Sequence, residues 1–217
     1  MKLQGVIFDC DGVLVDSETL GNQVLVEAVN ALGLHLTVEE ALTTFKGCKM
    51  ADCVATIEHW LGHPVAHDFV PNVRSRMAEV FRERLRPVEG IEEALDHIQV
   101  PFCVASSGPR DKIELSLRVT GLLPHFIGRI FSAYEVGSWK PDPGLFLHAA
   151  RGMSVAPQVC AVVEDSLPGV QAGLAASMPV FGYALPSESS RLKEAGAHVF
   201  NDMRELPQLL QVWNVAR

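Results

Sequence analysis

The sequence lacks the features that mark several classes of protein. Its five cysteines are an odd number without a Cys-x-x-Cys pair, which argues against a disulfide framework and favours a reducing compartment. No uncharged stretch reaches the roughly 18 residues that a membrane helix needs. The apolar run before Asp9 is too short for a signal peptide. We therefore expect a cytoplasmic protein that makes no contact with a membrane.

Positive charge is also scarce. Eighteen lysines and arginines oppose 26 acidic residues, which gives a formal net charge of −8 at pH 7. This balance argues against a general nucleic-acid binder, although a metal ion and one or two lysines can still attract a small phosphorylated molecule locally. With 217 residues, of which 48% are hydrophobic, the chain is long enough to bury a large core.

The most informative stretch lies near the beginning of the chain. Residues 6–8 are a short apolar run of the kind that forms a buried parallel strand, and the run stops at Asp9, followed by Asp11 and Gly12. Ligands in open α/β sheets gather at the carboxyl ends of strands, and Mg²⁺ suits a pair of neighbouring carboxylates. Asp-x-Asp-Gly is also a common turn sequence, so the motif alone does not decide between the two readings.

Residues 17–86 indicate helices without a strand. Apolar residues recur at helical spacing over 17–32, and Thr37 with Glu40 forms a capping-box pattern for a second helix that Gly47 ends. Further helices are predicted at 51–61 and 68–85.

From residue 87 onward, strands and helices alternate. Strands are predicted at 102–105, 130–131, 161–163, 180–181 and 198–200, with helices between them. Such alternation indicates a parallel sheet with right-handed crossovers. The predicted fold is α/β, a doubly wound Rossmann-like core (residues 1–16 and 87–217) with an inserted all-helical cap domain (residues 17–86).

Polar residues follow three of the later strands. Ser106 ends one, Glu164 and Asp165 end another, and Lys140 follows a third. Each residue alone fits a helix cap or an exposed turn. Together they would place a hydroxyl, a cation and two further carboxylates at the edge of the sheet where Asp9 lies.

These motifs together resemble those of the haloacid-dehalogenase superfamily, in the same order along the chain: DCDGVLVDSE, the strand-terminal Ser106, Lys140 in KPDP, and VVEDS. The helical insertion resembles the small cap of that superfamily, and the closest subfamily is that of the β-phosphoglucomutase-like phosphatases. The resemblance implies a phosphatase that acts on a small phosphorylated metabolite. Examples are a sugar phosphate and a sugar-acid phosphate such as 6-phosphogluconate. We expect a monomer or a weak dimer.

The resemblance also implies roles for individual residues. Asp9 would be the nucleophile, and Asp11 would donate and accept protons, which calls for a raised pKa that neighbouring carboxylates would supply. Mg²⁺ would be bound by Asp9, the main-chain carbonyl of Asp11, Asp165 and, directly or through water, Glu164. The phosphoryl oxygens would be held by Ser106, Lys140 and the N–H groups around Ser107 and Gly108.

Other activities on the same scaffold are less consistent with the sequence. Dehalogenases and phosphonate-cleaving members lack an acid at the position of Asp11. Mutases have a histidine where Gly21 stands and an arginine near Met50. A phosphosugar mutase remains the alternative, and a non-catalytic metabolite sensor is disfavoured because it would not need Asp11.

Within the cap, Lys46 and Lys49 are the candidates for binding a second anionic group of the substrate. Their position near a helix end explains them equally well, because cations are favoured there. We expect the arginines that alternate with Glu79 and Glu83 to form a solvated helix face; these are Arg74, Arg76, Arg82, Arg84 and Arg86.

Overall fold

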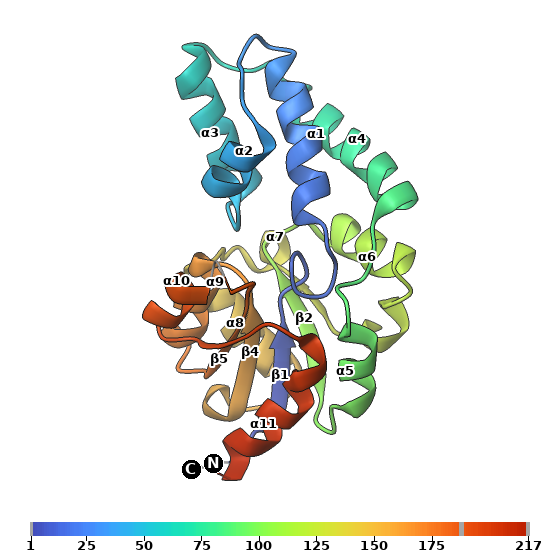
Figure 1. Cartoon of the computed structure of the whole chain (residues 1–217), viewed down its shortest axis with the longest axis vertical. Coiled ribbons are helices and arrows are strands. Elements are labelled where there is room, and N and C mark those ends of the chain that lie inside the picture. The colour runs from blue at the N-terminus through green and yellow to red at the C-terminus, as the bar shows by residue number, and fades with distance from the viewer. Residues whose placement is uncertain (1, 187–188, 216–217) are drawn as a thin grey trace.

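The structure, a computed structural model, describes residues 2–186 and 189–215 of the chain. A parallel sheet of six strands lies at the centre of the larger part (Figure 1). Its spatial order is β3-β2-β1-β4-β5-β6. The strands are β1 (Gly5–Phe8), β2 (Phe102–Ser106), β3 (Ile130–Ser132), β4 (Cys160–Glu164), β5 (Val180–Tyr183) and β6 (His198–Phe200). The winding direction reverses between β1 and β4, which is where sheets of this kind bind ligands.

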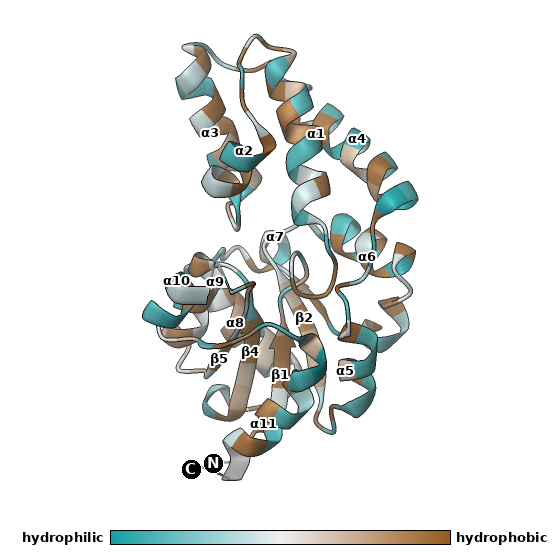
Figure 2. Cartoon of the chain, viewed as in Figure 1, coloured by the Kyte–Doolittle hydropathy of each residue, from teal (hydrophilic) through white to brown (hydrophobic). Residues whose placement is uncertain are grey.

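Helices cover both faces of the sheet, which confirms the predicted doubly wound α/β core. Along β1, Val6 and Phe8 face one apolar layer and Ile7 faces the other, so the strand is apolar throughout (Figure 2). The first layer includes residues of α5 (Ile91–His97), α6 (Arg110–Val119) and α11 (Leu206–Val215). The second includes residues of α8 (Gly144–Gly152), α9 (Leu167–Ala175) and α10 (Ser189–Glu194).

Four further helices stack above the carboxyl ends of the strands (Figure 1). They are α1 (Glu18–Asn30), α2 (Val38–Phe45), α3 (Met50–Leu61) and α4 (Phe69–Arg84). They share an apolar cluster of their own, which includes Val29, Ile57 and Val73. The chain enters and leaves this block side by side, because the N–H of Asp16 donates to the carbonyl of Arg86 at 3.0 Å. This arrangement supports a cap over residues 17–86, and the exact boundaries stay a prediction.

Two α-helices of the described chain were not predicted from the sequence. The first, α7 (Ala133–Val136), is a single turn after β3, too short to give a periodic apolar pattern. The second, α11, follows the last predicted strand, and its Leu206 and Leu210 are buried at helical spacing. Within the described ranges, no helix has the length and apolar character that crossing a membrane requires.

Candidate active site

Three neighbouring strands bring the predicted residues to one edge of the sheet. Asp9 directly follows β1, Ser106 ends β2, and Asp165 directly follows β4. The register pairs Phe8 with both Val104 and Val163, so these strands end nearly level. A cleft of about 490 Å³ lies between this edge and the cap. Among the predicted residues, its lining includes Asp9, Asp11, Ser106, Ser107, Gly108, Lys140, Asp165 and Lys49.

The loop after β1 brings the acidic residues close together. Gly12 has a φ of +74°, and a Cβ atom at this position would collide with the carboxylate of Asp165. Glycine adopts a positive φ readily and has no Cβ atom, so it alone fits this conformation so close to the carboxylate of Asp165. The Gly12 turn therefore allows the loop that carries Asp11 to lie directly against Asp165.

Lys140 is buried between two carboxylates. Its Nζ lies 2.7 Å from Asp9 Oδ1 and pairs with Glu164 Oε1, and only 3% of its side chain is exposed. Burial alone would lower the pKa of Lys140, but the charges of Asp9 and Glu164 outweigh burial and raise it. Lys140 therefore carries its positive charge beside Asp9.

Glu164 is fully buried and its carboxylate is largely occupied. In addition to the Lys140 pair, its Oε2 accepts hydrogen bonds from the N–H groups of Asp165 and Ser166 and from Ser166 Oγ, each at 2.9 Å. These contacts fit a residue that fixes Lys140 in place. They leave Asp9 and Asp165 as the stronger candidates for direct metal ligation.

The acidic group fits a divalent cation. Carboxylate oxygens of Asp9, Glu164 and Asp165 lie within 4.8 Å of one another. Burial raises the pKa of Asp9 and of Asp165, each to about 8, since desolvation and the neighbouring acids outweigh the lysines. Despite its ion pair with Lys140, Asp9 Oδ1 has no hydrogen bond of regular geometry to the described residues. A hard cation such as Mg²⁺, which prefers oxygen ligands, would stabilise both acids in their ionised form.

Asp11 differs from the expectation. Ser17 Oγ donates to its Oδ1 at 2.5 Å, and Lys112 Nζ donates to its Oδ2 at 2.7 Å. Burial would raise the pKa of Asp11, but the charge and hydrogen bond of Lys112, helped by Ser17, lower it overall. The predicted raised pKa of Asp11 was therefore wrong, because a cation that the sequence did not reveal, Lys112, lies beside the acid.

The sequence predicted no role at the site for Lys112 or for the side chain of Ser17. Lys112 lies in the first turn of α6, 101 residues from Asp11, and no motif spacing marks it. Ser17 precedes α1, where a serine normally caps the helix, yet its side chain makes no capping bond and turns to Asp11 instead. Next to it, burial raises the pKa of Glu18 to about 7.

The loop after β2 forms the side of the cleft opposite Asp165. Ser106 Oγ accepts a hydrogen bond from the N–H of Gly108 at 3.1 Å, and Ser132 Oγ donates to the carbonyl of Gly108 at 2.7 Å. Ser107 also lines the cleft, beside the start of α6. Hydroxyl and N–H groups at the beginning of a helix are suited to bind an anion such as phosphate.

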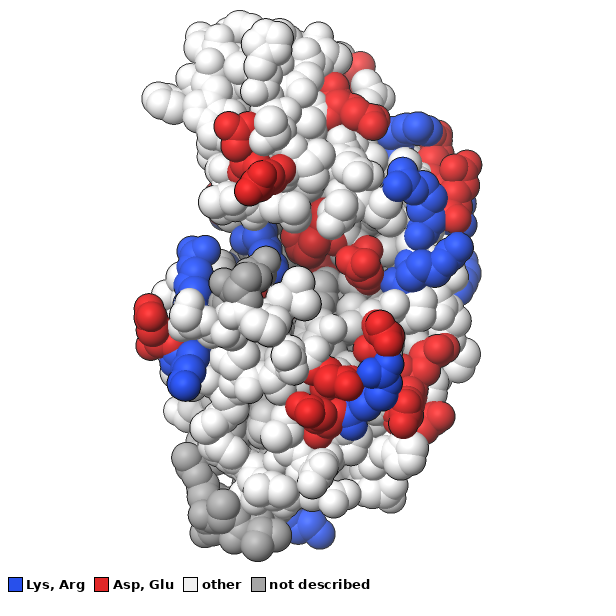
Figure 3. All heavy atoms as spheres, in the orientation of Figure 1, with Lys and Arg blue, Asp and Glu red and all other residues white. Residues whose placement is uncertain are grey.

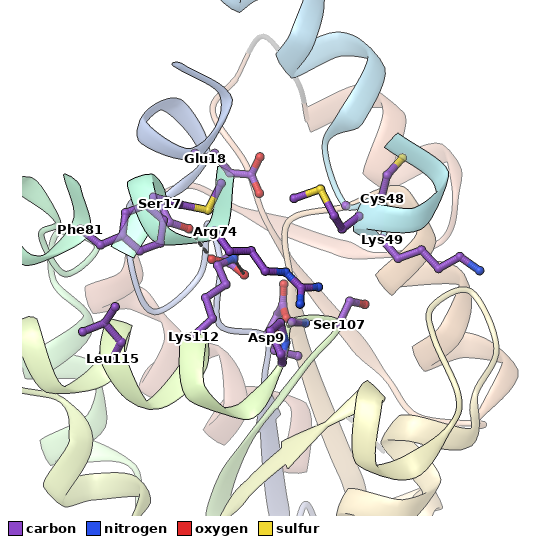
Figure 4. A pocket seen from close by; sticks show the side chains of 18 of the residues that line it. Asp9, Ser17, Glu18, Cys48, Lys49, Arg74, Phe81, Ser107, Lys112 and Leu115 are labelled. Carbon is purple, nitrogen blue, oxygen red and sulfur yellow. Dashed lines mark hydrogen bonds and ion pairs between the residues drawn. The ribbon is translucent and has the colours of Figure 1, made fainter. Parts of the chain in front are cut away.

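The two cap lysines that the sequence singled out, Lys46 and Lys49, have different partners. Lys46 Nζ lies 3.0 Å from Asp165 Oδ2. Lys49 Nζ lies 3.5 Å from Asp52 Oδ1, and in Figure 4 its side chain points away from Asp9. The arginines expected on a solvated face, Arg74, Arg76, Arg82, Arg84 and Arg86, are all exposed. Two of them, Arg74 and Arg82, also line the cleft, which the periodicity of α4 did not reveal.

Comparisons with known proteins agree with this architecture. The family model described as haloacid dehalogenase-like hydrolase matches residues 3–177. A 6-phosphogluconate phosphatase of Escherichia coli (strain K12) is 33% identical over 217 residues, covering 99% of this chain and 98% of the relative. A crystal structure of a haloacid dehalogenase-like protein of unknown function from Agrobacterium tumefaciens is 31% identical, with a TM-score of 0.85 and coverage of 97% and 99%. A HAD family hydrolase from Deinococcus radiodurans, solved with bound phosphate and sodium, is also 31% identical, with a TM-score of 0.78 and coverage of 97% and 96%.

Proposed function

Because the chain belongs to the haloacid dehalogenase-like hydrolases, we propose that it is a magnesium-dependent phosphatase acting on a small phosphorylated metabolite. The substrate would be a sugar phosphate or a sugar-acid phosphate such as 6-phosphogluconate, a class that the name of the E. coli relative supports. The observation that carries the proposal is the buried contact of Asp9 with Lys140, in a cleft that Asp11, Ser106 and Asp165 also line.

In the first step, a carboxylate oxygen of Asp9 would attack phosphorus while the bond to the leaving oxygen breaks. The phosphoryl group would then be an acyl phosphate on Asp9, and Asp11 would supply a proton to the departing alkoxide. Lys140 and Ser106 would hold the phosphoryl oxygens. In the second step, Asp11 would take a proton from the water that attacks phosphorus, which releases inorganic phosphate and restores Asp9.

The ion pair of Asp11 with Lys112 affects both proton-transfer roles of Asp11 in this cycle. The lowered pKa of Asp11 favours its ionised form, which is suited to be the base of the second step. Donating a proton in the first step would require the contact with Lys112 to loosen when the leaving group enters the cleft.

Asp9 and Asp165, with the main-chain carbonyl of Asp11, would hold Mg²⁺, and Glu164 would act through Lys140 or through water. When bound, the ion would lower the repulsion between the attacking carboxylate and the phosphate. The cap formed by residues 17–86 would cover the cleft, exclude water and select the leaving group.

The mutase alternative has weaker support. Gly21 lines the cleft at the position where mutases have a histidine, and Met50 lines it near the position of their arginine. Neither residue can move a proton or grip a second phosphate.

The proposal is tested by measuring phosphate release from p-nitrophenyl phosphate and a panel of sugar phosphates with Mg²⁺. Asp9→Asn should abolish release, whereas Asp96→Asn, the same change at an exposed position of α5, should not. Chelation of the metal should stop turnover reversibly. Activity retained by Asp9→Asn or after chelation would contradict the proposal, and isomerised sugar without released phosphate would favour a mutase.

A further inference from the structure

The cap helix α4 turns a distinct stripe of side chains toward the cleft. Arg74, Met77, Ala78 and Phe81 recur at helical spacing and all line it. Val73, on another face of α4, packs into the apolar cluster of the cap. This stripe is apolar between Arg74 at one end and Arg82 at the other, so it offers an apolar wall with a cation at each end.

Arg74 is held by neutral groups. Its Nη2 donates to the hydroxyl of Tyr134 at 2.7 Å, and its Cζ lies 5.4 Å from the centre of the Tyr134 ring. Tyr134 belongs to α7 of the core, so the contact spans the cleft from cap to core. In the described part of the chain, no carboxylate lies within ion-pair distance of Arg74.

The two lysines predicted to bind substrate, Lys46 and Lys49, are already engaged by other groups. Lys46 pairs with Asp165, and Lys49 lies beside Asp52 and 5.7 Å from the centre of the Trp139 ring. Figure 4 shows the contrast in direction: Arg74 extends toward Asp9 and Ser107, whereas Lys49 points away from them. Arg74 is therefore better placed than either lysine to meet the leaving group of a substrate.

A guanidinium group prefers an anionic partner to a phenol. Its fork of N–H groups matches a carboxylate with two parallel charge-assisted hydrogen bonds, which a single hydroxyl cannot provide. Arg74 is exposed, so its guanidinium group can exchange the tyrosine hydroxyl for another partner at little cost in free energy. Tyr134 would keep the guanidinium directed into the cleft until such a partner arrives.

We propose that Arg74 forms a subsite for a carboxylate on the leaving group, and that it selects sugar-acid phosphates over neutral sugar phosphates. The subsite deepens the proposed function and rests on it, since it assumes that a phosphate monoester binds with its phosphoryl group at Asp9. Met77 and Phe81 would contact the carbon chain between the two anionic ends.

Two open-chain probes isolate the carboxylate. They are 6-phosphogluconate, which ends in a carboxylate, and sorbitol 6-phosphate, which ends in a neutral hydroxymethyl group. The quantity to measure is the ratio of kcat/KM for the first probe to kcat/KM for the second. Arg74→Gln should lower this ratio about 10- to 100-fold, the range expected when hydrogen bonds to a charged group are lost. Arg74→Lys should restore part of the ratio, because it keeps the charge but not the fork.

Arg76→Gln is the matched control. Arg76 lies two residues further along α4, is exposed and donates to Glu79 at 2.9 Å. Basic and acidic side chains lie close together along the edge that α4 forms (Figure 3). The ratio for Arg76→Gln should equal that of the wild type. Arg82→Gln, at another cationic position of the cleft lining, should lower the ratio less than Arg74→Gln. An unchanged ratio in Arg74→Gln, or an equal or larger loss in either comparison variant, would overturn the subsite.

A failure of the proposed function would be recognised separately. A wild-type protein that hydrolyses neither probe nor p-nitrophenyl phosphate would refute phosphatase activity without bearing on Arg74. Calorimetry would then test the subsite: the wild type should bind 6-phosphogluconate about tenfold more tightly than sorbitol 6-phosphate, and Arg74→Gln should lose that preference. Equal affinities of the wild type for the two probes would overturn the subsite.

Discussion

The core side and the cap side of the cleft hold their charges in opposite ways. On the core side, Lys140 and Glu164 are buried and fixed by several partners, with 3% and 0% of their side chains exposed. On the cap side, Lys49 keeps 38% of its side chain exposed and contacts one exposed acid. A charge that is buried and paired cannot move without a large cost, whereas an exposed one can exchange partners readily. We therefore expect the core to fix the chemistry and the cap to select the substrate.

Lys140→Met should have the largest effect, since it leaves Asp9 and Glu164 buried without their cation. We expect turnover of every substrate to fall by a similar large factor, and the free energy of unfolding to fall by about 3–5 kcal/mol. Denaturant unfolding and phosphate release measure the two effects. Lys193→Met, on the exposed surface of α10, serves as the control. A loss confined to one substrate would contradict the division between core and cap.

Lys112→Met should slow the hydrolysis of some substrates more than that of others, according to whether the leaving group needs a proton. An alkoxide needs a proton from Asp11, whereas p-nitrophenolate leaves without one. Losing the cation that orients Asp11 should therefore slow alkyl phosphates about 10- to 100-fold and p-nitrophenyl phosphate much less. Lys112→Arg should recover part of the loss. Equal losses for both substrates would mean that Lys112 acts through the fold or the phosphate and not through Asp11.

The two acids also predict how stability depends on pH without metal. Burial raises the pKa of Asp9 and Asp165 from 3.8 to about 8, so between these values the folded protein binds more protons than the unfolded chain. Stability should therefore decrease as pH rises through this window. Denaturant unfolding with a chelator at pH 5 and pH 8 should show a decrease that is smaller in Asp165→Asn. An equal decrease of the free energy of unfolding in wild type and Asp165→Asn would contradict the raised pKa of Asp165.

Lys49→Gln should have the smallest effect. Its exposed pair with Asp52 and its contact with the Trp139 ring are weak interactions, so the ratio of specificity constants for 6-phosphogluconate and sorbitol 6-phosphate should change less than about threefold. A change as large as the one expected for Arg74→Gln would indicate that Lys49, which the sequence predicted to bind a second anionic group, binds the carboxylate of the substrate.

The strand ends were predictable from sequence because their signal is local. The apolar runs before Asp9, Ser106 and Asp165 indicate buried strands, and parallel strands present their carboxyl ends at one edge. The order of the motifs along the chain added the family resemblance, which the family model confirms over residues 3–177.

The residues that were missed depend on how helices dock. Lys112 reaches Asp11 because α6 begins beside the loop after β2, and Arg74 faces the cleft because α4 packs against α6. Helical spacing shows that residues share a face, but it does not show which partner that face meets. The pKa of Asp11 could not be predicted for the same reason, since its direction is set by Lys112.

The central claim is that Asp9 takes the phosphoryl group onto the protein. The most direct measurement is to quench the enzyme with acid during turnover with Mg²⁺, reduce any acyl phosphate with borohydride, and map the modified peptide by mass spectrometry. We expect modification at Asp9 that depends on substrate and disappears in Asp9→Asn. Steady phosphate release with no modification at Asp9, or with modification at another residue, would contradict it.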